Sequence, residues 1–167
     1  MVTPPRLRAV LLALGLAVVG GGCGNAVSAD IIGTTALTVD GRGAPVVLVA
    51  VCDQHVDTIE IYTGREGLED DEPNPSVASW TSSSPQTGTV TLALDRVSAA
   101  WTGPGAVRLA DDTLYIVSAS RSDADAETTQ VSFRGRAIAA LGPDQVIVRD
   151  GRVWTRERFD AQACVTE

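Results

Sequence analysis

The feature that most constrains the fold is a succession of short β-type segments separated by turn residues. Residues 45–52 read Pro-Val-Val-Leu-Val-Ala-Val-Cys, a continuous β-branched run that is typical of a strand buried on both faces. We expect this run to form the central strand. Residues 89–95 alternate Val and Leu with Thr and Ala, as a strand with one buried face does. Asp150-Gly151 separates two further apolar runs and is a strong signal for a two-residue hairpin.

These segments predict an all-β domain, specifically an antiparallel immunoglobulin-like β-sandwich with one or two short helices near the C-terminus. The first helix-like piece covers residues 136–141 and is stopped by Gly142-Pro143. Thr155 can cap a second short helix that holds Phe159 and Cys164. Loops are expected at 64–75, 82–88 and 123–127, and strands at 36–39, 45–52, 56–62, 77–81, 89–95, 107–109, 113–120, 130–134, 146–148 and 153–154.

The N-terminus has the pattern of an export signal. Arg6 and Arg8 precede an apolar run at 9–19, which is too short to span a bilayer but suits a signal peptide. Residues 19–23, Val-Gly-Gly-Gly-Cys, are similar to a bacterial lipobox, although Gly20 replaces the usual larger apolar residue. Cleavage before Cys23 would leave that cysteine as a lipidated N-terminus. The alternative is plain secretion, with cleavage after Val27-Ser28-Ala29.

The predicted organisation is therefore a lipoprotein signal peptide at 1–22, a tether at 23–35 and a single domain at 36–167. The chain carries a formal charge of −8, and loss of Arg6 and Arg8 with the signal peptide makes the mature domain more acidic. Such a domain repels phosphate backbones and anionic lipids, which argues against nucleic-acid binding and against electrostatic docking to membranes. Membrane attachment would then depend on the lipid anchor, and a partner would be a protein or a neutral glycan.

All basic residues are Arg, which with abundant Ala, Val and Gly is typical of a high-GC genome such as that of an actinobacterium.

The chain contains three cysteines. If Cys23 carries lipid, Cys52 and Cys164 remain as a pair, and in an exported protein a disulfide between them is the default expectation.

Two further groups of residues resemble one protein family. They are Ala50-Val51-Cys52 with His55-Val56-Asp57 and Ile61-Tyr62, and the run from Leu114-Tyr115 through Val131-Ser132-Phe133 to Ile138-Ala139-Ala140-Leu141 and Gln145-Val146. They are similar to a family of small exported actinobacterial lipoproteins that has no assigned activity. The resemblance spans roughly residues 39–164. It implies export, the cysteine pair and a β fold, and it carries over no activity, cofactor or site.

Candidate chemistry centres on His55, the single histidine. The spacing of Cys52 and His55 is that of half a zinc site, but the second pair of ligands is missing. In a regular strand Asp53, His55 and Asp57 would share one face, so the histidine would contact a carboxylate there. We expect a disulfide-bonded Cys52 and a histidine paired with a neighbouring aspartate, with no metal site.

Three other patterns are weaker. Residues 123–127 resemble half of a calcium loop, but the required glycine and the bidentate glutamate are absent, so a hairpin loop is expected. No Gly-x-Ser-x-Gly motif is present. Trp80, Trp101 and Trp154 could stack on sugar rings, although aromatic residues are scarce and the core needs them.

The sequence thus favours a lipid-anchored, non-catalytic envelope protein that acts as a binding or interaction module without a cofactor. Two alternatives remain open: a small envelope hydrolase that uses His55 and nearby carboxylates, and a metal-binding module.

Overall fold

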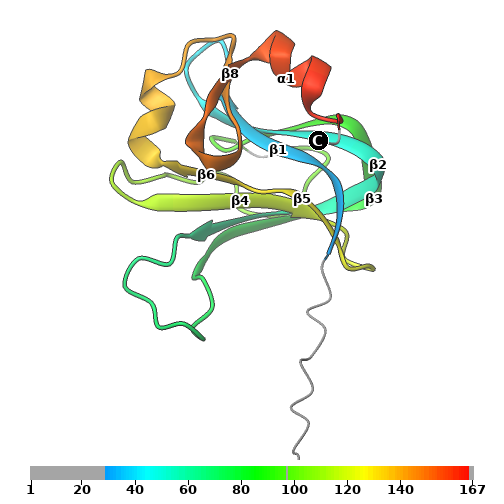
Figure 1. The fold of residues 1–167 in the computed structure, drawn as a ribbon, viewed down its shortest axis with the longest axis horizontal. Coiled ribbons are helices and arrows are strands. Elements are labelled where there is room, and N and C mark those ends of the chain that lie inside the picture. Colours follow the sequence, from blue (N-terminus) through cyan, green and yellow to red (C-terminus); the bar gives the residue numbers. More distant parts are fainter. Residues whose placement is uncertain (1–28, 97, 166–167) are drawn as a thin grey trace, which may run out of the picture.

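The computed structural model of the chain describes residues 29–96 and 98–165 (Figure 1). The predicted signal peptide at 1–22 and the lipidation site Cys23 lie outside these residues. The described chain is mostly strand with few helices, which confirms the all-β class. Its elements are β1 (Asp30–Val39), β2 (Pro45–Thr63), β3 (Ser76–Ala93), β4 (Leu114–Ser120), β5 (Ala126–Thr129), β6 (Val131–Arg134), the 3₁₀ helix η1 (Gly135–Ala140), β7 (Gln145–Ile147), the 3₁₀ helix η2 (Arg149–Gly151), β8 (Val153–Thr155) and the helix α1 (Arg156–Gln162).

The strands belong to one eight-stranded sheet in the order β3-β2-β4-β5-β1-β7-β8, with β6 paired to β4. Because β1 also pairs with β2, the four strands β1, β2, β4 and β5 form a closed barrel. The pairing of β1 with β5 is parallel, so the prediction of a wholly antiparallel fold is wrong at this point. The immunoglobulin-like sandwich is not confirmed, since the sheet closes on itself through this parallel pair.

The long strand β2 is the central strand, as its β-branched run predicts. Its first half pairs with β1 and its second half with β4, while β3 runs beside both halves. Between Val51 and Val56 the register with β3 shifts, because β2 uses more residues than β3 over the same stretch. We call the extra residues, Cys52–His55, the β2 bulge. Gln54 within it has a left-handed backbone with φ of 62°.

The predicted turn at residues 82–88 is instead strand, and β3 runs without interruption from Ser76 to Ala93. The turn-forming residues are accommodated because Val56 pairs with Gln86 while Thr58 pairs with Thr81, so β3 has its own surplus residues there. Ser82 and Gln86 satisfy each other by a side-chain hydrogen bond of 3.1 Å. Local turn chemistry therefore produced a bulged strand rather than a reversal of the chain.

The body begins at Asp30, six residues before the predicted domain boundary. Residues 30–35 were expected to belong to the polar tether, but they form the first part of β1. Both threonines of this stretch have hydrogen-bond partners. The hydroxyl of the buried Thr35 lies 2.5 Å from that of Thr128, and the hydroxyl of the half-buried Thr34 donates to the carbonyl of Ala163 at 2.7 Å. A buried hydroxyl that finds a partner loses little on leaving water, which explains how a polar stretch can join a core.

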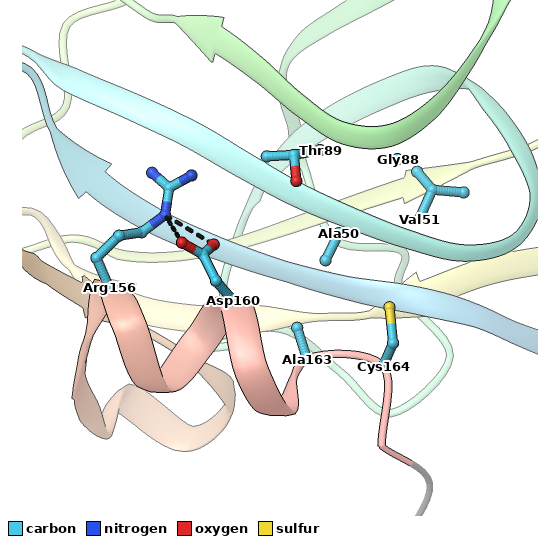
Figure 2. A pocket seen from close by; sticks show the side chains of 8 residues that line it. All are labelled: Ala50, Val51, Gly88, Thr89, Arg156, Asp160, Ala163 and Cys164. Atoms are coloured by element: carbon cyan, nitrogen blue, oxygen red, sulfur yellow. Dashed lines mark hydrogen bonds and ion pairs between the residues drawn. The ribbon is translucent and has the colours of Figure 1, made fainter.

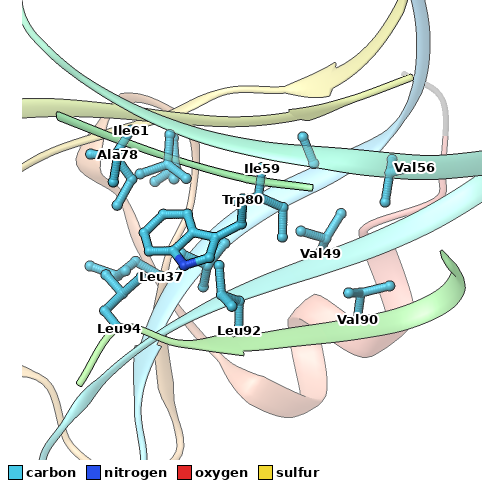
Figure 3. Packing of buried hydrophobic residues seen from close by; sticks show 14 of the residues in the cluster. Leu37, Val49, Val56, Ile59, Ile61, Ala78, Trp80, Val90, Leu92 and Leu94 are labelled. Carbon is cyan, nitrogen blue, oxygen red and sulfur yellow. The ribbon is translucent and has the colours of Figure 1, made fainter. Parts of the chain in front are cut away.

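The main core fills the space enclosed by the bent strands. Figure 3 shows Trp80 at its centre, packed among aliphatic side chains of β1, β2 and β3. The indole Nε1–H of Trp80 donates to the carbonyl of Pro104 at 3.1 Å, so the polar atom of this buried ring is satisfied. The labelled neighbours are Leu37, Val49, Val56, Ile59, Ile61, Ala78, Val90, Leu92 and Leu94.

A second, smaller core lies on the opposite face of β1 and β2, beneath α1. Phe159 of α1 is fully buried there against Ala36 and Leu48. Val47 and Val49, which alternate with Leu48, belong to the main core instead. The run 45–52 is therefore buried on both faces, as predicted, because α1 covers the face that would otherwise meet water (Figure 1).

The C-terminal predictions largely hold. Strands β7 and β8 form an antiparallel hairpin that includes Asp150-Gly151. The predicted two-residue connection is wrong, because the 3₁₀ helix η2 (Arg149–Gly151) lies between the strands. Thr155 caps α1, and its hydroxyl accepts from the backbone N–H of Arg158. The piece expected to be helical at 136–141 is the 3₁₀ helix η1. The predicted edge strand at 107–109 is wrong, since these residues lack strand pairing.

Candidate functional site

The candidate site lies at one end of the barrel, where the β2 bulge meets the loop between β4 and β5. The left-handed Gln54 interrupts the alternation of β2, so His55, the last residue of the bulge, and Asp57 beyond it do not continue the face of Asp53. The loop at residues 121–125 brings Asp123 to the same place. One donor atom of each of His55, Asp57 and Asp123 lies within 4.8 Å of the others. We call these three residues the His55 cluster.

Asp57 is held in place by the β4–β5 loop. Its Oδ1 accepts from the backbone N–H of Ser122 at 2.9 Å and from the hydroxyl of Thr58 at 2.9 Å, and its Oδ2 accepts from the hydroxyl of Ser122 at 2.8 Å. Partial burial raises the pKa of the Asp57 carboxyl, but the hydrogen bonds from Ser122 and Thr58, with the charge of His55, outweigh burial and lower the pKa overall. Asp57 is therefore a positioned carboxylate at neutral pH.

Asp123 is more exposed and is paired with Arg121. The guanidinium of Arg121 contacts Oδ1 of Asp123 at 2.9 Å and also donates to the side-chain carbonyl of Gln54. Arg121 thus ties the β4–β5 loop to the β2 bulge and balances one carboxylate charge. Both of its contacts with Asp123 fall on Oδ1.

The hydrogen bonds around His55 do not resemble those of a catalytic site in which a serine nucleophile is paired with a histidine base. The Ser122 hydroxyl, a candidate nucleophile next to the cluster, donates to Asp57 and not to the imidazole of His55. A catalytic serine needs a base that can take its proton, and Asp57, with its lowered pKa, is a poor one.

The sequence predictions for this site are met in part. His55 and Asp57 do lie together, whereas Asp53, which was expected on the same face, is exposed and outside the cluster. Asp123 comes from the segment that resembled half of a calcium loop. The other acids of that segment, Asp125 and Glu127, do not belong to the cluster; Glu127 lies in β5, and its carboxylate accepts from the side-chain amide of Gln130 at 3.4 Å.

The predicted disulfide is present. Cys52 of the β2 bulge and Cys164, just after α1, are joined with an S–S distance of 2.06 Å. Next to it lies a shallow pocket of about 330 Å³ between α1 and the β2–β3 pair (Figure 2). Arg156 and Asp160 line it but bind each other, with Nε of Arg156 2.9 Å from Oδ1 of Asp160. The two charged groups of this pocket are thus already paired with each other.

A second pocket, of about 420 Å³, lies beside β5 and η2 and includes the exposed Ile31. Its charged lining residues are Glu127, Arg149 and Asp150. Asp150 has a left-handed backbone, with φ of 62°, because it occupies the tight connection between β7 and β8. This conformation is explained by the turn and needs no ligand.

The tryptophans do not form an exposed stacking platform. Trp80 and Trp101 are buried in the main core. Trp154 is half-buried, and the guanidinium of Arg158 lies 4.3 Å from its ring centroid. The expectation that the core needs the aromatic residues is confirmed for Trp80 and Trp101, while the face of Trp154 is occupied by a cation–π contact.

The acidic loop at 64–75 is organised around Arg65. Its guanidinium donates to the carbonyls of Asp70 and Glu72 at 3.0 and 2.7 Å, and Glu66 pairs with Arg134 at 2.5 Å. The segment is a loop, as expected, and its backbone carbonyls point inward to one arginine. The carboxylate of Glu66 is taken up by Arg134, and that of Glu72 accepts from the backbone N–H of Glu69 at 3.4 Å, so these two carboxylates already have partners.

Comparison of the chain with protein-family profiles, with curated proteins and with solved structures finds no match. Among the described residues, no helix is both long and apolar enough to span a bilayer.

Proposed function

We propose that the protein is a lipid-anchored, non-catalytic module that binds a protein or a neutral glycan on the outer face of the cell membrane. The observation that carries the proposal is the distribution of the three cysteines. Cys52 and Cys164 are consumed by a disulfide within the body, which leaves Cys23, at the end of the export signal, as the cysteine for lipidation. The proposal needs an all-β body and does not depend on an immunoglobulin-like arrangement.

The position of β1 supports such an anchor. The body starts at Asp30, and the seven residues from Cys23 to Ala29 can reach at most about 25 Å when fully extended. A lipid on Cys23 would therefore hold the start of β1 close to the membrane surface. Cleavage at either predicted position, before Cys23 or after Ala29, leaves β1 complete.

The non-catalytic assignment is supported by the geometry around His55. Ser122 is directed to Asp57 instead of the histidine, and Arg121 neutralises part of the cluster. The acidic excess of the chain disfavours anionic partners such as nucleic acids.

Mass spectrometry of the mature N-terminus tests the anchor. A diacylglyceryl group on Cys23 is expected, together with release of the protein into the medium when Cys23 is replaced by Ser. A mature chain that begins with an unmodified Asp30 would refute the anchor and favour plain secretion.

The envelope hydrolase is kept as a second candidate, because His55, Asp57 and Asp123 do come together. Under the binding proposal, His55→Ala leaves partner binding intact, measured by cross-linking on intact cells followed by identification of the captured molecule. Under the hydrolase, His55→Ala abolishes turnover of ester and glycoside model substrates by the purified protein. Turnover that is lost in this variant but kept in Asp53→Asn would overturn the non-catalytic assignment.

A further inference from the structure

We infer that the His55 cluster is a binding site for a divalent transition-metal ion of the zinc class. The inference is independent of the lipid anchor and of the partner. Its basis is the convergence of one imidazole and two carboxylates from segments that are distant in sequence, with donor atoms within 4.8 Å of one another.

The donor set selects the metal. Imidazole nitrogen favours Zn²⁺ and its neighbours over Ca²⁺ and Mg²⁺, which prefer oxygen ligands throughout. Three protein ligands with an open fourth position, filled by water, are a known form of zinc site. Ligand bonds of about 2.0–2.2 Å place tetrahedral donors about 3.3–3.6 Å apart. The donor atoms of the cluster, all within 4.8 Å of one another, are near this spacing.

The surroundings of Asp57 are those of a supported metal ligand. Ser122 and Thr58 fix the carboxylate by three hydrogen bonds, and its Oδ2 accepts one of them, from the hydroxyl of Ser122. A carboxylate oxygen has two lone pairs, so Oδ2 can accept this bond and still bind a cation. Hydrogen bonds of this kind orient ligands and raise metal affinity.

The positive charge of Arg121 should weaken metal binding at the His55 cluster. Its guanidinium lies 2.9 Å from Oδ1 of Asp123, where it competes with a bound cation for the charge of this residue. Asp57 and Asp123 together carry two negative charges against the one positive charge of Arg121, so the cluster keeps a net attraction for a dication. Removal of the arginine charge should strengthen metal binding, whereas in a purely structural cluster it would only loosen the loop.

The test is calorimetric titration of Zn²⁺ into the purified exported protein after treatment with EDTA and removal of the chelator. A parallel titration with Co²⁺ follows the visible absorption bands of the coordinated ion. A thiol assay first verifies that no free cysteine is present. The expected result is one Zn²⁺ per chain, with His55→Ala and Asp123→Asn each weakening binding at least tenfold.

Two variants sharpen the result. Asp53→Asn removes an acid from the same bulge but outside the cluster, and it should bind within about twofold of the wild type. Arg121→Gln should bind Zn²⁺ several-fold more tightly. Circular dichroism of each variant establishes that the fold is kept.

The inference is overturned if the wild type takes up no Zn²⁺. It is also overturned if His55→Ala binds as well as the wild type, or if Ca²⁺ binds as tightly as Zn²⁺ and independently of His55. The last outcome would show only the general attraction of surface carboxylates for cations.

Discussion

Cys52 and Cys164 are separated by 112 positions in the chain, yet their Cα atoms lie 5.2 Å apart. The bond ties the end of the chain, just after α1, to the bulge of the central strand. It therefore fixes α1 over the face of β1 and β2 that carries the second core.

We expect the double variant Cys52→Ser with Cys164→Ser to unfold at a lower denaturant concentration than the wild type. A crosslink over a loop of this length stabilises the folded state by at most about 4–5 kcal/mol, through the lower entropy of the unfolded chain. Urea unfolding with and without a reductant measures the difference. The reductant should destabilise the wild type and leave the double variant unchanged. An equal response of both proteins would show that the disulfide does not support the fold.

Phe159 is the side chain through which α1 seals the second core. It is fully buried, whereas Glu157 on the same helix is exposed. Phe159→Ala should cost about 3–5 kcal/mol of unfolding free energy, because the lost burial is compounded by a cavity. Phe159→Leu should cost clearly less, and Glu157→Ala no more than about 1 kcal/mol. The prediction fails if Phe159→Ala and Glu157→Ala have similar midpoints in urea.

Much of the fold is present in local sequence pattern. The β-branched run at 45–52 correctly predicts a strand buried on both faces. The Asp150-Gly151 signal correctly predicts the β7–β8 hairpin but not the length of its connection, which contains η2. These features depend on periodicity and turn chemistry, which act over a few residues. The closure of the sheet depends on the parallel pairing of β1 with β5, between segments about 95 positions apart, and no local pattern encodes it.

The predicted start of the folded domain, at residue 36, is wrong for a related reason. Residues 30–35 contain little apolar character apart from Ile31 and Ile32, so they were assigned to the tether. Their burial is made possible by Thr128, on a distant strand, whose hydroxyl meets that of Thr35. In a composition count a threonine is polar, and the sequence does not show whether its hydroxyl will have a hydrogen-bond partner in the folded protein.

Gly33 occupies a position that only glycine can fill. A Cβ atom there would lie 2.1 Å from the carbonyl oxygen of Ala50, which is backbone and cannot move aside cheaply. Gly33→Ala should therefore destabilise the protein by about 1–3 kcal/mol or more, because β1 must separate from β2. Gly41→Ala is the matched control, since a Cβ at Gly41 meets nothing within 4 Å. Thermal unfolding of both variants measures the difference, and equal melting temperatures would contradict the close approach of Gly33 to the backbone of Ala50.

The candidate site was only half predictable. His55 and Asp57 are two residues apart, so a strand pattern placed them together correctly. The same pattern wrongly included Asp53, because it assumed regular alternation through Gln54, whose left-handed backbone reorients the chain. Asp123 could not be assigned to the cluster from spacing, since its position depends on how the β4–β5 loop meets the bulge. Its contact with Arg121 and the anchoring of Asp57 by Ser122 are tertiary in the same sense.

Asp40 gives the fold a predictable response to acid. Its Oδ1 accepts from the backbone N–H groups of Arg42 and Ala44, at 2.9 and 3.0 Å, and its Oδ2 lies 3.2 Å from the guanidinium groups of Arg42 and Arg96. The two backbone hydrogen bonds are the main cause that lowers the pKa of Asp40 from 3.8 to about 2, and the arginine side chains add to the shift. The ionised form is thus favoured in the folded state.

A group whose pKa is lower in the folded than in the unfolded state contributes stability above its unfolded pKa. For Asp40 this contribution is complete above about pH 5 and is lost as the pH falls from about 4 towards 2. The difference in unfolding free energy between the wild type and Asp40→Asn should therefore be largest near neutral pH and should shrink through this range. Urea unfolding at several pH values measures the difference, and Asp71→Asn, in the exposed acidic loop, controls for loss of charge alone. A difference that stays constant from pH 6 to pH 2 would mean that the carboxylate of Asp40 does not hold the β1–β2 turn through its charge.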